Sequence, residues 1–138
     1  MKSKVTNKTR AITLGIFMVL AVIICSAGCL QQPSVTFTQA DNNATVQVAA
    51  GSQFAVQLES NPTTGYEWNA SVSKGLLITN SRYQADANPG NMVGVGGNQI
   101  WIVKANAAGK QTFSAIYKQP WMRTTGKETA FVLYVNVT

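Results

Sequence analysis

The 138-residue chain contains no histidine, and its only two cysteines, Cys25 and Cys29, stand near the N-terminus. Histidine is the commonest general base and metal ligand in proteins, and cysteine supplies a thiol nucleophile. The residues beyond Cys29 therefore lack the side chains on which most metal-dependent and thiol-dependent sites are built. They also lack a disulfide, so the stability of a domain formed by them has to come from an apolar core.

Acidic residues are scarce as well, and no two of the five stand closer than eight residues apart. Nothing in this spacing favours a carboxylate pair of the kind that glycosidases assemble. We therefore expect that the protein is not an enzyme and that it needs no cofactor and no metal ion. The five acids are Asp41, Glu59, Glu67, Asp86 and Glu128.

Positive charge is concentrated at the N-terminus, where Lys2, Lys4, Lys8 and Arg10 precede an apolar run over residues 11–27. A charged segment followed by an apolar segment is typical of a signal peptide. We expect residues 1–28 to be a signal peptide or membrane anchor, residues 29–34 a tether and residues 35–138 the folded domain. Each version places the domain outside the cytoplasm, either secreted or tethered to the outer face of the cell membrane.

Three kinds of processing fit the end of the apolar run. Ser26, Ala27 and Gly28 precede Cys29 as in a lipoprotein signal, in which the cysteine is lipidated, although such signals usually carry an aliphatic residue at the position of Ser26. Cleavage near Ala27 without a lipid is the second possibility. The third is a retained anchor, since about 17 apolar residues reach the low end of the length that spans a bilayer. Membrane contact is expected only through this lipid or anchor.

The remaining charge gives no sign of a nucleic-acid surface. Without the leader, seven basic residues face five acids, which leaves a net charge of +2. The basic residues are scattered and never form a run, whereas nucleic-acid surfaces gather them in patches or stripes. We therefore expect no nucleic-acid partner.

Apolar residues beyond the tether alternate with polar ones and almost never recur at helical spacing. Phe54, Val56 and Leu58, for example, predict a strand with one buried face. The whole pattern predicts about seven to eight short strands joined by turns, which is typical of an antiparallel β-sandwich of immunoglobulin-like architecture. The strands are predicted at residues 35–38, 45–48, 53–58, 66–69, 99–105, 109–118 and 127–137, with a weaker segment at 71–78 and a short edge piece at 82–85.

Three connections between the predicted strands are more elaborate than plain turns. Residues 61–66 combine proline, two threonines and glycine, residues 86–97 are rich in glycine and asparagine, and residues 118–127 carry Trp121. Because an even number of chain reversals separates each from the next, all three are predicted at one end of the sandwich. Trp121 either folds back onto the rim or is presented for binding, while Trp68 and Trp101 are expected in the core.

The glycine-rich segment does not continue as a nucleotide-binding fingerprint, because Gln99 stands where that pattern needs glycine and a strand is predicted where it needs a helix. Taken with the other two loops, however, the segment resembles one of the three signature loops of the chagasin-like inhibitors of papain-type cysteine proteases. The similarity covers about residues 35–137. It is carried by Asn61, Pro62, Thr63, Thr64, Gly65 and Tyr66, by Gly94, Val95, Gly96 and Gly97, and by Gln119, Pro120 and Trp121.

The resemblance implies a chagasin-type sandwich that inhibits papain-family cysteine proteases reversibly and competitively, as a monomer. In that family the three loops form a wedge that enters the active-site cleft. Thr63 and Thr64 would approach the catalytic thiolate and histidine, residues 94–97 would follow the non-primed side, and Trp121 would pack on the primed side. The chain differs from the family at Gln119, where arginine is common, which bears on a basic contact at the rim.

A second hypothesis from another class is a surface-anchored, immunoglobulin-like adhesion module whose loops bind a protein or glycan other than a protease. Asn43, Asn69 and Asn136 also match the acceptor pattern for N-glycosylation. That pattern is common by chance and informs only on a host that glycosylates its proteins.

Overall fold

The computed structural model describes residues 32–88 and 90–138. They fall within one compact unit, Gln31–Thr138. Across these two ranges no helix has both the length and the apolar character to cross a membrane. The predictions about the leader, its processing and the lipidation of Cys29 concern residues outside the described ones.

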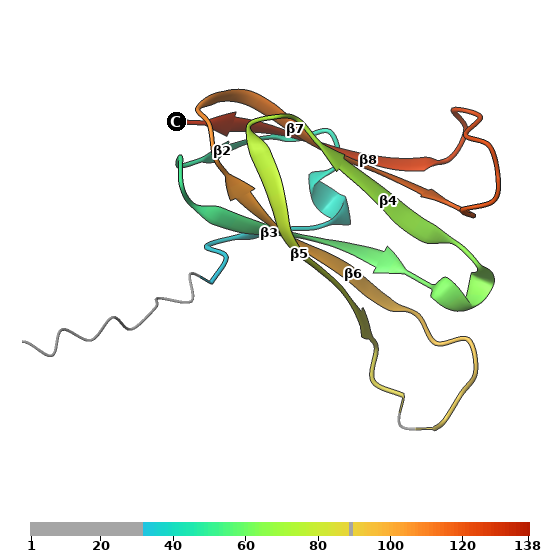
Figure 1. The fold of residues 1–138 in the computed structure, drawn as a ribbon. Helices are drawn as coiled ribbons and strands as arrows, with labels where there is room; N and C mark the ends of the chain where they lie inside the picture. The colour runs from blue at the N-terminus through green and yellow to red at the C-terminus, as the bar shows by residue number, and fades with distance from the viewer. Residues whose placement is uncertain (1–31, 89) are drawn as a thin grey trace, which may run out of the picture. The chain divides into compact units, whose positions relative to one another are not determined.

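The domain consists of two four-stranded sheets that face each other, so the all-β sandwich predicted from the sequence is confirmed (Figure 1). Two single-turn 3₁₀ helices, η1 (Gln39–Asp41) and η2 (Pro62–Thr64), lie between strands. The first sheet has the order β1 (Thr36–Phe37), β3 (Gln53–Ser60), β6 (Gly97–Ala105) and β5 (Leu76–Ala85). The second has the order β2 (Thr45–Val48), β8 (Thr129–Val137), β7 (Gly109–Lys118) and β4 (Glu67–Val72).

The core forms between the sheets from the apolar positions of the period-two pattern. Phe54 and Leu58 of β3 are fully buried, as are Phe113 of β7 and Phe131 of β8. Trp101 of β6 is 3% exposed and packs edge-on against Phe113, with 5.5 Å between the ring centroids. Each such side chain contributes roughly 1.5–3 kcal/mol when it leaves water. The core placement predicted for Trp101 is confirmed.

Two strands run in a direction that the alternation did not predict. β1 pairs in parallel with β3, and β2 pairs in parallel with β8, whereas the other four pairings are antiparallel. The chain passes from the first sheet to the second between β1 and β2, and back again between β2 and β3. A parallel pairing needs such a crossover, and period-two alternation carries no information about direction.

The region predicted as a weak segment and a short edge piece is one strand, β5, which spans ten residues. Its register against β6 shifts between Ile78 and Asn80, and the Thr79 hydroxyl there donates to the carbonyl of Ile102 at 3.1 Å. Eight of its ten residues are exposed, including all seven from Thr79 onward. An edge strand with so little burial shows no clear alternation, which explains why the sequence pattern broke it in two.

Candidate functional site

The three elaborate connections lie at one end of the domain, opposite the C-terminus (Figure 1). The central loop (residues 61–66) joins β3 to β4, the glycine loop (residues 86–96) joins β5 to β6, and the Pro-Trp loop (residues 119–128) joins β7 to β8. The predicted location of all three at a common end is therefore confirmed.

The central loop contacts both of its neighbours. The side-chain amide of Asn61 donates to the carbonyl of Gly94 in the glycine loop at 3.0 Å. On the other side, the indole of Trp121 packs over Gly65, where an added Cβ would lie 2.9 Å from Cη2 of the tryptophan. The three segments thus form one continuous surface with the central loop in the middle.

The sequence of the central loop folds it into η2. Asn61 is the N-cap and its Oδ1 accepts from the backbone N–H of Thr63 at 3.2 Å, while Pro62 occupies the first turn, where its missing N–H costs nothing. Gly65 ends the turn in the left-handed region, with φ of 79°. The proline and glycine that distinguish this segment in the sequence thus lie at the start and the end of a capped 3₁₀ turn.

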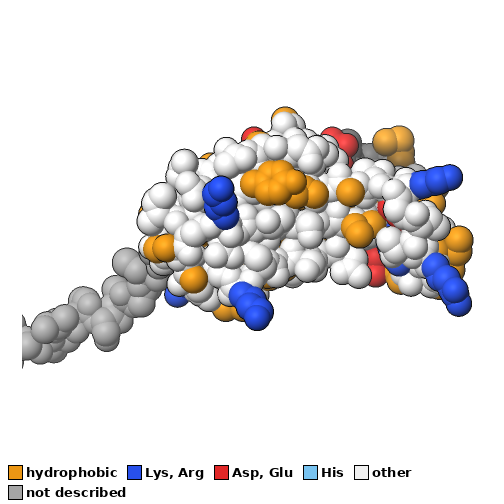
Figure 2. All heavy atoms as spheres, turned by 90° about the horizontal axis from the view of Figure 1, so that it is seen from above, with side chains coloured by type: hydrophobic (Ala, Val, Ile, Leu, Met, Phe, Trp, Pro, Cys, Tyr) orange, Lys and Arg blue, Asp and Glu red, His pale blue; other side chains and the backbone are white. Residues whose placement is uncertain are grey.

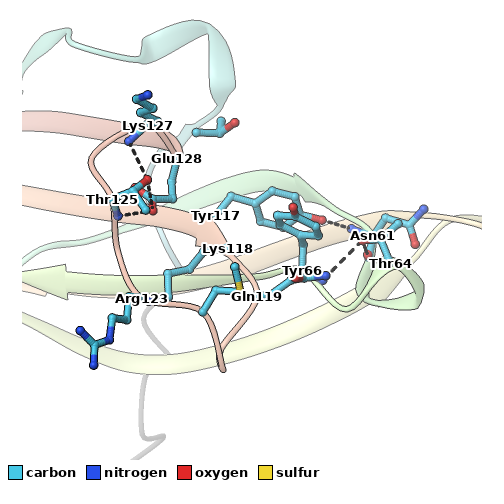
Figure 3. Close-up of a pocket in the computed structure, with 12 residues that line it drawn as sticks. Asn61, Thr64, Tyr66, Tyr117, Lys118, Gln119, Arg123, Thr125, Lys127 and Glu128 are labelled. Carbon is cyan, nitrogen blue, oxygen red and sulfur yellow. Dashed lines mark hydrogen bonds between the residues drawn. The ribbon is translucent and has the colours of Figure 1, made fainter.

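Aromatic side chains support the base of the central loop. The ring of Tyr117 lies 5.5 Å from that of Tyr66 and 5.0 Å from that of Trp68, and its hydroxyl accepts from the backbone N–H of Asn61 at 2.9 Å (Figure 3). The indole N–H of Trp68 donates to the carbonyl of Glu59 at 2.8 Å. The core placement predicted for Trp68 needs a correction. It is half-buried and packs against the core without being part of it, while its indole nitrogen reaches the loop base.

Sequence reasoning missed Tyr117. A signal was present, because Phe113, Ala115 and Tyr117 alternate along β7 and so share the face that packs inward. An aromatic residue at the last inward position before a loop is placed to contact the neighbouring loop. Its partner could not be read from spacing, since Asn61 is 56 residues away in the chain.

The glycine loop is organised by Asn88, which the sequence analysis also missed. Its side chain accepts from the backbone N–H of Met92 at 2.8 Å and donates to the carbonyl of the same residue at 2.7 Å. Asn91 and Gly94 both adopt positive φ, of 49° and 77°. This arrangement leaves Val93 almost wholly in solvent, at 99% exposed.

The predicted site residues of this loop fall into two groups. Gly94 and Val95 lie within the loop, Gly94 exposed and Val95 partly buried. Gly97 instead begins β6 and is buried, and an added Cβ would meet the carbonyl of Gln84 and the hydroxyl of Tyr83. A Cβ on Gly96 would lie 3.3 Å from the carbonyl of Ser60. Packing inside the domain therefore requires glycine at 97, whereas at 96 a side chain would be tight against the backbone of Ser60.

The Pro-Trp loop begins with a tight turn, in which the N–H of Met122 donates to the carbonyl of Gln119 at 3.0 Å. Pro120 and Trp121 occupy the corner of this turn, and Trp121 stays 70% exposed although it touches Gly65. Of the two possibilities left open by the sequence, presentation describes this side chain better than burial on the rim.

Exposed apolar side chains gather at the loop end. Among the described residues, nine large hydrophobic side chains are exposed, and five of them belong to the three loops. Exposed apolar groups concentrated in this way mark an interaction surface more often than scattered ones do. The five are Tyr66, Met92, Val93, Trp121 and Met122.

A shallow hollow of about 670 Å³ lies between the central loop and the Pro-Trp loop (Figure 3). Lys118, Arg123 and Lys127 line it together with Glu128, and basic and apolar side chains stand side by side at this end of the surface (Figure 2). The ammonium of Lys118 donates to the hydroxyl of Thr124 at 3.0 Å, whereas the guanidinium of Arg123 points outward.

The carboxylate of Glu128 closes the Pro-Trp loop on itself. It accepts from the backbone N–H of Thr125 at 2.5 Å, from the hydroxyl of the same residue at 3.0 Å and from the backbone N–H of Gly126 at 2.8 Å. These bonds, led by the one from the Thr125 backbone, lower the pKa of Glu128 from 4.5 to about 2. In the described ranges, acidic side chains nowhere gather in a group of three or more that could hold a metal ion.

Comparison with known proteins shows to which family the chain belongs. Residues 47–135 match the model of the "Chagasin family peptidase inhibitor I42". The chain is 32% identical to amoebiasin-1 of Entamoeba histolytica over 103 residues, which cover 75% of this chain and 99% of the relative. It is 30% identical to chagasin of Trypanosoma cruzi over 105 residues, which cover 72% of this chain and 94% of chagasin.

Comparison with solved structures supports the same family. The crystal structure of a cysteine protease inhibitor from Entamoeba histolytica superposes with a TM-score of 0.65 at 25% identity, covering 77% of this chain and 99% of the other. The solution structure of amebosin superposes with a TM-score of 0.64 at 32% identity and covers the same shares of the two chains. On the family match, the two relatives and the shared fold, the chain belongs to the chagasin family of peptidase inhibitors.

Proposed function

We propose that this protein inhibits papain-like cysteine proteases reversibly and competitively by inserting the central loop, flanked by the glycine loop and the Pro-Trp loop, into the active-site cleft. The single observation that supports this most is the contact of the central loop with both flanking loops, through Asn61 and Gly94 on one side and Gly65 and Trp121 on the other. Family membership supports the inhibitory activity, and the comparisons give no support to an adhesion module.

The central loop has the physical properties that an inserted tip needs. Its turn is closed by its own N-cap and by Gly65, so little conformational entropy remains to be lost on binding. Residues 61–66 carry no charged side chain, so entry into a narrow cleft does not bury a charge. In this proposal Thr63 and Thr64 lie over the catalytic centre.

The flanking loops would supply most of the contact area. Trp121, exposed at the corner of its turn, is the kind of residue that forms an interface hot spot. Gly94 and Val95 would follow the non-primed side together with the exposed Met92 and Val93. The inhibitor contributes no reacting group, so binding would be reversible, and a single domain would suffice for it as a monomer.

Titration of papain with the compact unit, residues 31–138, tests the proposal. We expect competitive inhibition at or below micromolar inhibitor, with no effect on a serine protease such as trypsin assayed in parallel. Papain that stays fully active at micromolar inhibitor would remove the proposal and favour the adhesion alternative. A Leu77→Ala variant serves as the control and should inhibit papain as well as the unaltered domain does, since Leu77 is an exposed apolar residue on β5 outside the three loops.

We further propose that the domain acts outside the cytoplasm, secreted or held at the outer face of the membrane through residues 1–28 or a lipid on Cys29. The charged and apolar segments of the leader support this location. Mass spectrometry of the native N-terminus tests it. A mature chain that begins at a lipidated Cys29, one cleaved near Ala27 and one that retains the leader differ in mass and are distinguished directly.

A further inference from the structure

The hydrogen-bond donors along the backbone of the central loop are all used inside the domain. The N–H of Asn61 donates to Tyr117, that of Thr63 to Asn61 Oδ1, and that of Thr64 to the Asn61 carbonyl. The N–H of Gly65 donates to the carbonyl of Pro62 at 2.9 Å. That of Tyr66 donates to the Thr64 hydroxyl at 3.4 Å. Pro62 has no N–H to offer.

The two threonine hydroxyls also donate their hydrogen bonds within the domain. Thr63 Oγ1 donates to Asn61 Oδ1 and Thr64 Oγ1 donates to the Asn61 carbonyl, both at 2.6 Å. Rotating either hydroxyl outward would break a short bond of the capped turn. What Thr63 and Thr64 at the exposed tip still offer is acceptors. The hydroxyl oxygens keep lone pairs, and the carbonyl oxygens of Thr63 and Thr64 accept no hydrogen bond from any described residue.

We infer that the central loop recognises hydrogen-bond donors, and that in the protease active site it selects the imidazolium of the catalytic histidine and not the thiolate beside it. This rests on the proposed function. A thiolate is an acceptor, so a tip that presents acceptors gains nothing from it and meets like charge density. An imidazolium carries two N–H donors and a positive charge, whereas neutral imidazole exposes one bare acceptor nitrogen.

Charged groups of this chain surround the tip on both sides. Glu59 and Asp86 line a hollow next to Asn61 on the side of the glycine loop. Lys118, Arg123, Lys127 and Glu128 line the hollow on the side of the Pro-Trp loop, where the phenols of Tyr66 and Tyr117 also lie. The chain has no histidine of its own. A histidine that titrates in the complex therefore belongs to the protease.

The test compares wild-type papain with papain in which alanine replaces the catalytic cysteine, both binding residues 31–138 in a calorimeter at pH 5 and pH 8. In the wild-type enzyme the neighbouring thiolate keeps the histidine charged across this range, so equal affinity is expected. Without the thiolate the histidine pKa falls towards about 6.5. The alanine enzyme should then bind within about threefold of wild type at pH 5 and at least tenfold more weakly at pH 8.

Two results would overturn the inference. If the alanine enzyme binds ten times more weakly than wild type at pH 5, the tip recognises the thiolate. If the alanine enzyme binds with equal affinity at both pH values, the tip recognises neither the thiolate nor the charge on the histidine. The double variant Glu59→Gln with Asp86→Asn, run through the same series, should keep the tenfold ratio, which separates the protease histidine from the carboxylates of this chain. No binding to wild-type papain at pH 5 would instead remove the proposed function, and the inference with it.

Discussion

The hydroxyl of Tyr117, on β7 of the second sheet, accepts a hydrogen bond from the backbone N–H of Asn61, which follows β3 of the first sheet, at 2.9 Å. The bond joins the two sheets directly beneath the central loop. It fixes the residue that caps η2 and whose side chain also reaches the glycine loop. The position of the tip therefore depends on a side chain from the opposite layer of the sandwich.

Tyr117→Phe keeps the ring between Tyr66 and Trp68 but removes this hydrogen bond. A bond of this type is worth about 1 kcal/mol, which corresponds to about a fivefold change in an equilibrium constant. We expect the inhibition constant for papain to rise about fivefold, mainly through slower association with a less ordered tip. Tyr134→Phe, at an exposed tyrosine on β8, should leave the constant unchanged. A lower Tm for Tyr117→Phe with unaltered inhibition would make Tyr117 merely structural.

Gly65→Ala tests the contact between Gly65 and Trp121. Alanine at a positive φ costs roughly 1–2 kcal/mol, and its Cβ would also push the indole aside. We expect a lower Tm together with inhibition weakened at least tenfold. Gly51→Ala is the matched control, because Gly51 has φ of 82° and nothing within 4 Å of an added Cβ. The control should show a similar fall in Tm with normal inhibition, and weakened inhibition there would point to global destabilisation.

Trp121→Ala should weaken inhibition of papain by at least about thirtyfold, since truncated hot-spot residues cost about 2 kcal/mol or more. The indole is 70% exposed, so its loss should change the Tm by no more than about 2 °C. Inhibition kinetics and a melting curve on the same preparation distinguish a lost contact with the protease from a destabilised fold. Unchanged inhibition, or a large fall in Tm, would contradict the role given to this side chain.

Glu128→Gln tests the closure of the Pro-Trp loop as a function of pH. Because the folded-state pKa of Glu128, about 2, lies below the ordinary value of 4.5, the charged carboxylate stabilises the fold fully above pH 4.5. That contribution fades as the pH falls through 4.5 and is lost below about 2. Wild type should therefore melt above the variant at pH 6, and the two Tm values should converge near pH 2. A constant difference at all pH values would contradict this pKa.

The sequence predicted the strands whose apolar residues alternate cleanly, because burial of one face leaves a period of two. Phe54, Val56 and Leu58 in β3 are an example. It also placed the three loops at one end, since antiparallel connections alternate between ends. It failed at β5, an exposed edge strand, and at the direction of β1 and β2, because neither exposure nor crossover connections leave an alternating signal.

At the candidate site, residue types pointed to the right segments but not to the contacts inside them. Pro62 and Gly65 marked the central loop as more elaborate than a plain turn, and Trp121 marked the Pro-Trp loop while leaving open whether its indole is presented or packs on the rim. Tyr117 and Asn88 hold these loops in place, but the alternation along β7 gave only the inward face of Tyr117, and nothing in the sequence gave the partner of either residue. Their partners depend on how side chains pack between neighbouring loops.

By itself, the sequence determined the all-β class, the absence of histidine and of charge at the tip, and the three loop motifs, since each follows from local composition or from a period of two. Only the tertiary structure decided that the backbone N–H groups of the central loop donate to acceptors within the domain. It also decided that Trp121 lies on Gly65 and that packing leaves no room for a side chain at Gly97. These depend on distances between residues far apart in the chain, which are fixed when the two sheets pack around their shared core.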